Sequence, residues 1–229
     1  MLTNRLKTVT SLVETGTSIA DIGTDHAYVP IYLVQKGLVS KAICTDIKEG
    51  PCRIARENIR TYGLQEKIEV RCGSGLSVLK PSEIDIGIIA GMGGEVIASI
   101  LNKEYFIAKS IRKFIVQPMT ALDELRLFFY QNGYHIINEV LSKEKNKYYV
   151  IMEVVHQFVE VPELEYLYIG KKLIEKNDPL LEEYLLYKIT LYEAALEGMK
   201  LSLHPPTDKE KYRYLISKFK NMVENIRNK

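Results

Sequence analysis

The sequence SIADIGTDHAYVP, residues 18–30, decides the fold of this chain. Small and apolar residues run up to Gly23, three polar residues follow, and Pro30 opens an apolar segment typical of a helix. This order predicts a buried strand, a tight turn and a helix start. In an open α/β sheet the ligand crevice lies beyond the carboxyl ends of the strands, where the strand order reverses. We therefore look first at this turn for a functional site.

An amphipathic segment precedes this strand. Apolar residues recur at spacings of three and four between Leu2 and Val13, which predicts a helix with one apolar face. We expect this helix to cover the sheet edge or the ligand pocket, with Arg5 and Lys7 free to face a partner.

Strand and helix patterns alternate along the first 160 residues. The predicted strands with helices or links between them are 18–22, 41–45, 67–72, 84–90 and 113–116. Two runs of strand composition, 135–144 and 147–156, come last and are joined by a charged tip at 143–147. The pattern predicts an α/β fold with a Rossmann-like sheet and a terminal antiparallel hairpin. It departs from the two similar parallel halves of nicotinamide-binding folds.

From about residue 160 the apolar spacing becomes helical to the end of the chain. Two long helical segments lie on either side of His204, Pro205 and Pro206, which predicts an antiparallel coiled-coil hairpin joined by a proline turn. We therefore expect a first domain at 1–160 and a helical domain at 161–229.

The composition is that of a globular protein, not of a disordered or fibrous one. The chain has 229 residues, of which 46% are hydrophobic and 26% charged, enough for one well-cored domain and an appendage. The net charge is only +2, so any basic surface must be local. We find neither a signal-like amino terminus nor an apolar run of about 18 residues. The expectation is a cytoplasmic protein that does not span a membrane.

The three cysteines are Cys44, Cys52 and Cys72, an odd number with no Cys-x-x-Cys pair. Two of them lie in or at the end of apolar runs. We expect reduced, buried thiols and not disulfides or zinc ligands. His26 has no partner at metal spacing, so no metal site is predicted, and a hydrogen-bonding contact or turn residue is a better interpretation of it than a general base.

Acidic residues end the first two predicted strands. Asp21 is followed by Gly23, which lets the backbone approach a ligand, but the glycine-rich motif of dinucleotide sites is missing. Asp25 is a poor neighbour for phosphate and a good one for an ammonium or sulfonium group. Asp46, 25 residues after Asp21, can accept both hydroxyls of an adenosine ribose. A solvated strand-end carboxylate or cap is the alternative for Asp46.

Glycines follow the third and fourth strands. The turn containing Ser74 and Gly75 would lie where an adenine ring binds, although an ordinary turn is nearly as good an interpretation. Gly91, Met92 and two further glycines follow the fourth strand. Three glycines in four residues at this place indicate that the main chain closely approaches a ligand.

The sequences DIGTDHAYVPIYL, IAGMGG and VQPM together resemble the bacterial tRNA adenine-22 N1-methyltransferase family of class I S-adenosylmethionine-dependent methyltransferases. The resemblance extends over essentially the whole chain and implies a Rossmann-like catalytic domain, a coiled-coil domain and S-adenosylmethionine as cofactor. The cofactor-binding residues that it implies are Asp21, Gly23, Asp25, His26, Asp46, Ile47, Ser74, Gly75, Gly91 and Met92. GMGG replaces the Asn-Pro-Pro-aromatic motif of enzymes that methylate the exocyclic amine, which fits attack by a ring nitrogen.

The implied reaction needs little help from an acidic or basic side chain, because adenine N1 already carries an in-plane lone pair. Alignment and exclusion of water would lower the barrier. We expect Asp25 or Gln117 to hold the base through its amino group, and Tyr28 to stack on it. Gln117 and Pro118 would line the acceptor pocket. A packed core tyrosine is the alternative for Tyr28, and a strand-ending turn is the alternative for Gln117 and Pro118.

A basic segment lies at the carboxyl end. Residues 208–229 hold seven Lys or Arg and three acids, a local charge of +4. This segment could clamp tRNA phosphates, or it could be an ordinary solvated coiled-coil face. With the resemblance in view, we expect a monomeric tRNA methyltransferase. A small-molecule methyltransferase and a noncatalytic RNA-binding module remain alternatives.

Overall fold

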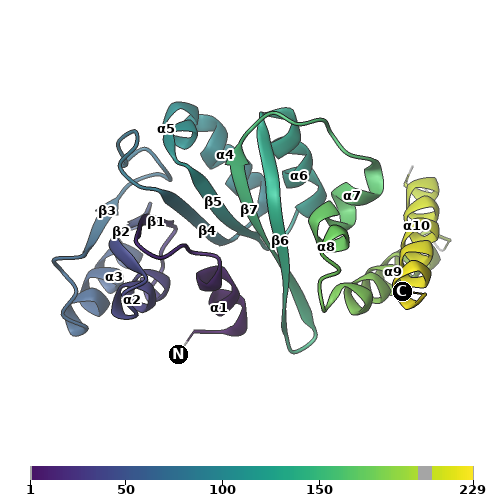
Figure 1. Cartoon of the computed structure of the whole chain (residues 1–229), viewed down its shortest axis with the longest axis horizontal. Coiled ribbons are helices and arrows are strands. Elements are labelled where there is room, and N and C mark those ends of the chain that lie inside the picture. Colours follow the sequence, from purple (N-terminus) through teal and green to yellow (C-terminus); the bar gives the residue numbers. More distant parts are fainter. Residues whose placement is uncertain (1, 201–207, 229) are drawn as a thin grey trace. The chain divides into compact units, whose positions relative to one another are not determined.

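Figure 1 shows the chain as a computed structural model, which describes residues 2–200 and 208–228. The chain divides into two compact units, Met1–Val161 and Pro162–Lys229. No helix in the described part of the chain is both long and apolar enough to cross a membrane.

The first unit is built on one seven-stranded sheet with the order β3-β2-β1-β4-β5-β7-β6. The strands are β1 (Thr17–Ile22), β2 (Val39–Asp46), β3 (Ile68–Cys72), β4 (Ile86–Met92), β5 (Lys113–Pro118), β6 (Tyr134–Glu144) and β7 (Lys147–His156). The first five are parallel, and β7 pairs antiparallel with both β5 and β6. The chain moves outward from β1 to β3 and then returns to β4 on the other side of β1. The strand order therefore reverses between β1 and β4, where a ligand crevice is expected.

Helices cover both faces of the sheet. They are α1 (Asn4–Ser11), α2 (Tyr28–Gln35), α3 (Glu49–Thr61), α4 (Gly94–Lys103), α5 (Tyr105–Ser110) and α6 (Leu122–Gln131). In Figure 1, α1 to α3 lie on one side of the sheet and α4 to α6 on the other. Between these layers the central strands form the core, where Ile19, Ile88 and Ile115 are fully buried.

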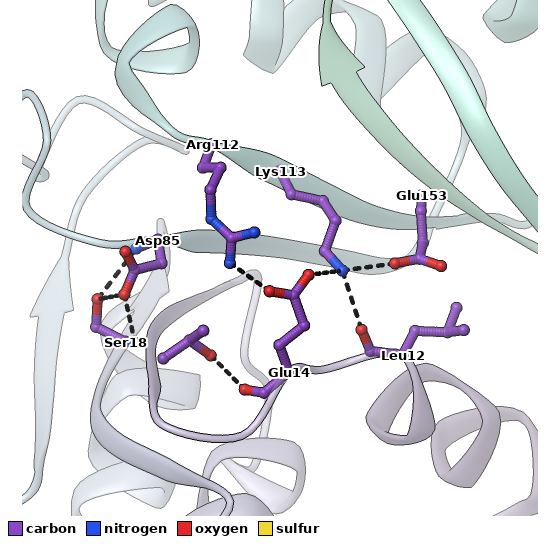
Figure 2. A network of polar contacts seen from close by, with 8 residues as sticks. Leu12, Glu14, Ser18, Asp85, Arg112, Lys113 and Glu153 are labelled. Carbon is purple, nitrogen blue, oxygen red and sulfur yellow. Dashed lines mark hydrogen bonds and ion pairs between the residues drawn. The ribbon is translucent and has the colours of Figure 1, made fainter.

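A polar network ties the carboxyl end of α1 to the sheet (Figure 2). The buried Lys113 side chain forms ion pairs with Glu14 at 2.8 Å and with Glu153 at 2.6 Å. Its Nζ also donates to the carbonyl oxygen of Leu12 at 3.2 Å, and Arg112 pairs with Glu14 at 2.8 Å. The end of α1 is thus attached to the start of β5 and, through Glu153, to β7.

The cysteines correct one prediction. Cys52 and Cys72 form a disulfide, with their Cα atoms 6.1 Å apart, while Cys44 is a free, buried thiol. The expectation of reduced thiols is therefore wrong for Cys52 and Cys72. Twenty residues separate the two positions, but β2 and β3 are adjacent strands, so the first turn of α3 lies beside the end of β3. Sequence spacing does not reveal this proximity.

The second unit is helical and consists of α7 (Leu164–Ile169), α8 (Lys171–Glu175), α9 (Leu181–Lys200) and α10 (Lys209–Arg227). The ring of Tyr192 in α9 stacks on Phe219 in α10, with centroids 6.0 Å apart. Ion pairs at 2.7 Å also join these helices, Lys220 with Glu193 and Arg227 with Glu182. The predicted proline turn at 204–206 lies outside the described residues.

Candidate functional site

Two cavities meet at Gly23, which lines both. The first has a volume of about 320 Å³ and lies between α1, the end of β1 and the turn that leads into α2. Its lining includes Arg5, Asp21, Thr24, Asp25, His26, Tyr28 and Ala90. The second has a volume of about 400 Å³, and its lining includes Asp46, Ile47, Ser74, Gly75, Met92 and Glu95. Of the ten cofactor-binding residues proposed from sequence, only Gly91 is not among the described lining residues.

The backbone at Gly23 admits no other residue without displacing its surroundings. Its φ is +80°, in the left-handed region, and a Cβ built there would lie 2.0 Å from the Cε atom of Met92. The Gly23 N–H donates to the carbonyl oxygen of Thr45 at 2.7 Å, which fixes the turn against β2. The absence of a side chain therefore leaves room for the end of the Met92 side chain where the two cavities meet.

Asp21 is a buried carboxyl group at the first cavity. Its exposed fraction is only 8%, and Thr24 donates a hydroxyl hydrogen bond of 2.5 Å to it. Burial raises the pKa of Asp21 to about 6; the bond from Thr24 opposes this shift and the negative charge of Asp46 adds to it. Because a positive charge would stabilise the ionised form of both carboxylates, the site favours a cationic ligand.

The turn into α2 presents polar and aromatic groups at the mouth of the first cavity. His26 Nε2 lies 3.2 Å from a carboxylate oxygen of the exposed Asp25, and the His26 ring stacks on Tyr28 with centroids 5.0 Å apart. The Tyr28 side chain is 53% exposed, so it is not a core tyrosine. Ala27 is the helix N-cap, with a φ of 58° and no side-chain cap bond. Asp25 therefore does not cap α2.

The end of β2 offers a carboxylate and an apolar surface to the second cavity. The backbone N–H of Lys48 donates to Asp46 Oδ1 at 2.9 Å, and no described residue donates to Oδ2. Ile47 is exposed, although it is a large apolar residue. Gly75, with a φ of +55°, turns the chain where it lines the same cavity. A flat apolar ring and a pair of hydroxyl groups are the chemical features that these groups match.

Gln117 does not reach either cavity. Its side chain is fully buried, its Nε2 donates to the carbonyl oxygen of Pro118 at 2.7 Å, and its Oε1 accepts from Arg5 Nη1 at 2.5 Å. Neither Gln117 nor Pro118 is among the described lining residues. The residue that reaches the cavity is Arg5, which the sequence suggested was free to face a partner. A helical pattern cannot reveal a contact with a residue 112 positions away.

Comparisons with known proteins identify the family of this chain. Residues 2–152 match the family described as methyltransferase domain. The chain is 38% identical over 151 residues to the tRNA (adenine(22)-N(1))-methyltransferase of Bacillus subtilis (strain 168), over 66% of this chain. The alignment spans 63% of the length of that relative.

Two solved structures cover nearly the whole chain at 30% sequence identity. One is a putative tRNA (m1A22) methyltransferase from Streptococcus pneumoniae in complex with S-adenosyl-L-methionine, with a TM-score of 0.86 over 97% of this chain and 100% of that chain. The other is TrmK of M. capricolum with the cofactor product S-adenosyl-homocysteine, with a TM-score of 0.81 over 99% of each chain. The chain therefore belongs to the methyltransferase-domain family and, within it, to the bacterial tRNA (adenine-22-N1)-methyltransferases.

Proposed function

We propose that this protein transfers a methyl group from S-adenosylmethionine to N1 of adenine 22 in the D-arm of tRNA. The observation that carries the proposal is the pair of cavities that meet at Gly23, one lined by Asp21 and the other by Asp46. S-adenosylmethionine supplies an electrophilic methyl group on a positively charged sulfur. The two carboxylates suit such a cation, and Gly23 allows it to approach the main chain.

The cofactor has a place on each side of Gly23. Asp46 binds the ribose hydroxyls through its free oxygen, Ile47 packs on the adenine face, and Ser74 and Gly75 lie at the adenine edge. The methionine part lies in the first cavity, where the binding residues are Asp21, Asp25 and His26. Met92 and Gly91 lie at the reactive side, at the end of β4. No metal is required.

The acceptor adenine reaches the mouth of the first cavity after it leaves the tRNA stack, which costs a few kcal/mol. Tyr28 stacks on its face, since the Tyr28 ring is exposed and supported from behind by His26. Asp25 accepts a hydrogen bond from the N6 amino group. The protein then needs no general base, because N1 has a free lone pair, and its task is to align N1 with the methyl group and exclude water. Gln117 and Pro118 do not line the cavity. Gln117, which is bonded to the Pro118 carbonyl oxygen, positions Arg5, and Arg5 reaches the cavity.

The helical unit, residues 162–229, serves as a tRNA grip in which α9 and α10 form the coiled coil. Its local positive charge is smaller than the sequence suggests, because three cations of α10 are paired with acids outside residues 208–229: Lys218, Lys220 and Arg227. Lys211 pairs with Asp208, which the charge of +4 already includes. Arg213 is exposed, and no described residue forms an ion pair with it. The catalytic domain is residues 1–160. We expect the protein to act as a monomer in the cytoplasm.

The test is transfer of a radiolabelled methyl group from S-adenosylmethionine to an unmodified tRNA transcript that carries adenine at position 22. The matched control is the same transcript with guanine at that position. We expect label only in the first transcript, and mass spectrometry should locate it as N1-methyladenosine at position 22. Equal labelling of both transcripts, or of neither, would contradict the proposal.

A further inference from the structure

Arg5 brings a positive charge from the first helix into the cavity that holds Asp21 and Asp25. Its Nη1 atom lies 3.5 Å from the place where a Cβ of Gly91 would be. The guanidinium is therefore next to the main chain at the end of β4, the reactive side of the proposed methyl-transfer site. None of the ten residues assigned to the cofactor supplies a cation there.

The surroundings of Arg5 fix its position. Nη1 donates to Gln117 Oε1, and the Cζ atom lies 5.7 Å from the centroid of the Tyr149 ring. The backbone N–H of Arg5 donates to Glu144 Oε1 at 2.6 Å. At the other end of α1, Lys113 holds Leu12 and Glu14 (Figure 2). The side chain thus has much of its conformational freedom already removed before a ligand binds.

The charge of Arg5 is only partly offset by nearby acids: Asp21 and Asp25 line the same cavity, and Glu144 accepts from the Arg5 backbone N–H. Its side-chain partners are a neutral amide and an aromatic ring, and no described carboxylate forms an ion pair with its guanidinium. Three other arginines of the same unit differ, since Arg71, Arg112 and Arg126 each pair with a glutamate. A partly buried cation without a counterion is unfavourable unless a ligand supplies the anion.

We propose that Arg5, positioned by Gln117 and Tyr149, binds an oxyanion of the reactants in the methyl-transfer site. A guanidinium has five N–H donors, and those not used by Gln117 suit two oxygens of a carboxylate or phosphate. In the reaction proposed above, on which this inference rests, the oxyanion is either the carboxylate of S-adenosylmethionine or the phosphodiester next to the target adenine.

The experiment compares four full-length proteins: wild type, Arg5→Gln, Arg5→Lys and Lys7→Gln. Lys7 is exposed on the same helix, so its variant removes an equal charge without touching the cavity. Calorimetry measures the Kd for S-adenosylmethionine alone, filter binding measures the Kd for unmodified tRNA, and steady-state assays give kcat and KM. The thermal midpoint of each variant shows whether it folds.

We expect Arg5→Gln to weaken one of the two Kd values by at least about tenfold, with a smaller loss for Arg5→Lys and none for Lys7→Gln. A loss of affinity for S-adenosylmethionine identifies its carboxylate as the ligand of Arg5. A loss of affinity for tRNA identifies the phosphodiester. The proposal is overturned if both Kd values and kcat stay within about twofold of wild type, or if Lys7→Gln reproduces the loss.

A second variant keeps the test decisive if Arg5→Gln fails to fold. Gln117→Glu keeps the shape of the side chain and gives Arg5 a carboxylate partner within the protein. It should weaken the binding of the same ligand, because the internal carboxylate then competes with the ligand oxyanion. Unchanged affinity for both S-adenosylmethionine and tRNA would reject the inference. If the wild-type protein methylates no tRNA, the proposed function fails. The two binding measurements still show whether Arg5 contacts a ligand oxyanion.

Discussion

The buried carboxyl group of Asp21 makes the free protein sensitive to pH. Its pKa in the folded protein is about 6, above the ordinary value of 3.8 for an aspartate. The protonated form therefore contributes stability that is fully present below about pH 4 and is lost as the pH rises through about 6. A shift of this size corresponds to roughly 3 kcal/mol between those limits. A cationic cofactor reverses the preference, because it binds best when Asp21 is ionised.

Asp21→Asn should separate these two effects. At pH 8 the variant without ligand should have a higher thermal midpoint than wild type, since it no longer buries a charge, and at pH 5 the difference should shrink. Its affinity for S-adenosylmethionine at pH 8 should fall by about tenfold or more, because the partner of the sulfonium or ammonium is gone. Scanning fluorimetry and calorimetry at both pH values check this. An unchanged affinity would show that Asp21 serves the fold and not the cofactor.

Gly23→Ala tests the place where the cavities meet. The new Cβ would be strained at a φ of +80° and would push against Met92, so we expect a loss of about 1 kcal/mol of unfolding free energy and at least about tenfold weaker cofactor binding. Gly63→Ala is the matched control, since Gly63 has a φ of +66° with nothing within 4 Å of its Cβ position. It should lose similar stability and keep its affinity. Equal affinities of the two variants would contradict the assigned role of Gly23.

Single residues were predictable where they lie at or directly after the carboxyl end of a strand. Asp21, Gly23 and Asp46 end parallel strands, and parallel strands bring their carboxyl ends to one edge of the sheet. The bond between Arg5 and Gln117 and the disulfide of Cys52 and Cys72 depend on strand order and helix docking. No local pattern carries that information.

At the scale of elements, α6 and β6 are joined by an ion pair that is almost completely buried. Arg126 and Glu139 each have a side-chain exposure of 1%, with Nη2 and Oε1 2.9 Å apart. Removing either residue breaks this pair in an almost fully buried environment. Arg126→Met should therefore lower the free energy of unfolding by about 3–5 kcal/mol in urea titrations. Arg112→Met, which breaks the exposed pair with Glu14, should lower it by less than about 1 kcal/mol. Similar losses for both variants would show that burial does not decide the strength of the pair.

The parallel strands were predictable because buried strands are continuous apolar runs, and their predicted and observed bounds differ by a few residues. The short helix α5 was not, since its six residues are too few to show a helical period. The GMGG sequence was expected to follow the fourth strand, yet β4 continues to Met92 with an irregular register between Ala90 and Met92. A glycine-rich strand end and a turn have the same composition, and only the pairing with β5 distinguishes them.

At the scale of the whole molecule, binding a folded tRNA requires cations that the protein leaves unpaired. Because each phosphate contact releases counterions, log Kd for tRNA should vary with log salt concentration in proportion to the number of such contacts. Arg213 is the exposed α10 arginine without a described ionic partner, whereas Lys220 already pairs with Glu193 at 2.7 Å. Arg213→Gln should therefore weaken tRNA binding and lower the salt slope by about 1. Lys220→Gln should change the slope less, and neither variant should change the affinity for S-adenosylmethionine.

Filter binding at four salt concentrations measures the slopes, and calorimetry measures cofactor affinity on the same preparations. If Lys220→Gln lowers the slope as much as Arg213→Gln, the ion pair with Glu193 opens when RNA binds. Cations of residues 208–229 that pair with acids in the free protein can then also contact tRNA phosphates. If neither slope changes, the tRNA contacts lie outside these two positions of α10, and the helical unit loses its support as the grip. Because the described residues that line the two cavities proposed for the cofactor all belong to the first unit, a change in cofactor affinity alone would also contradict this division of roles.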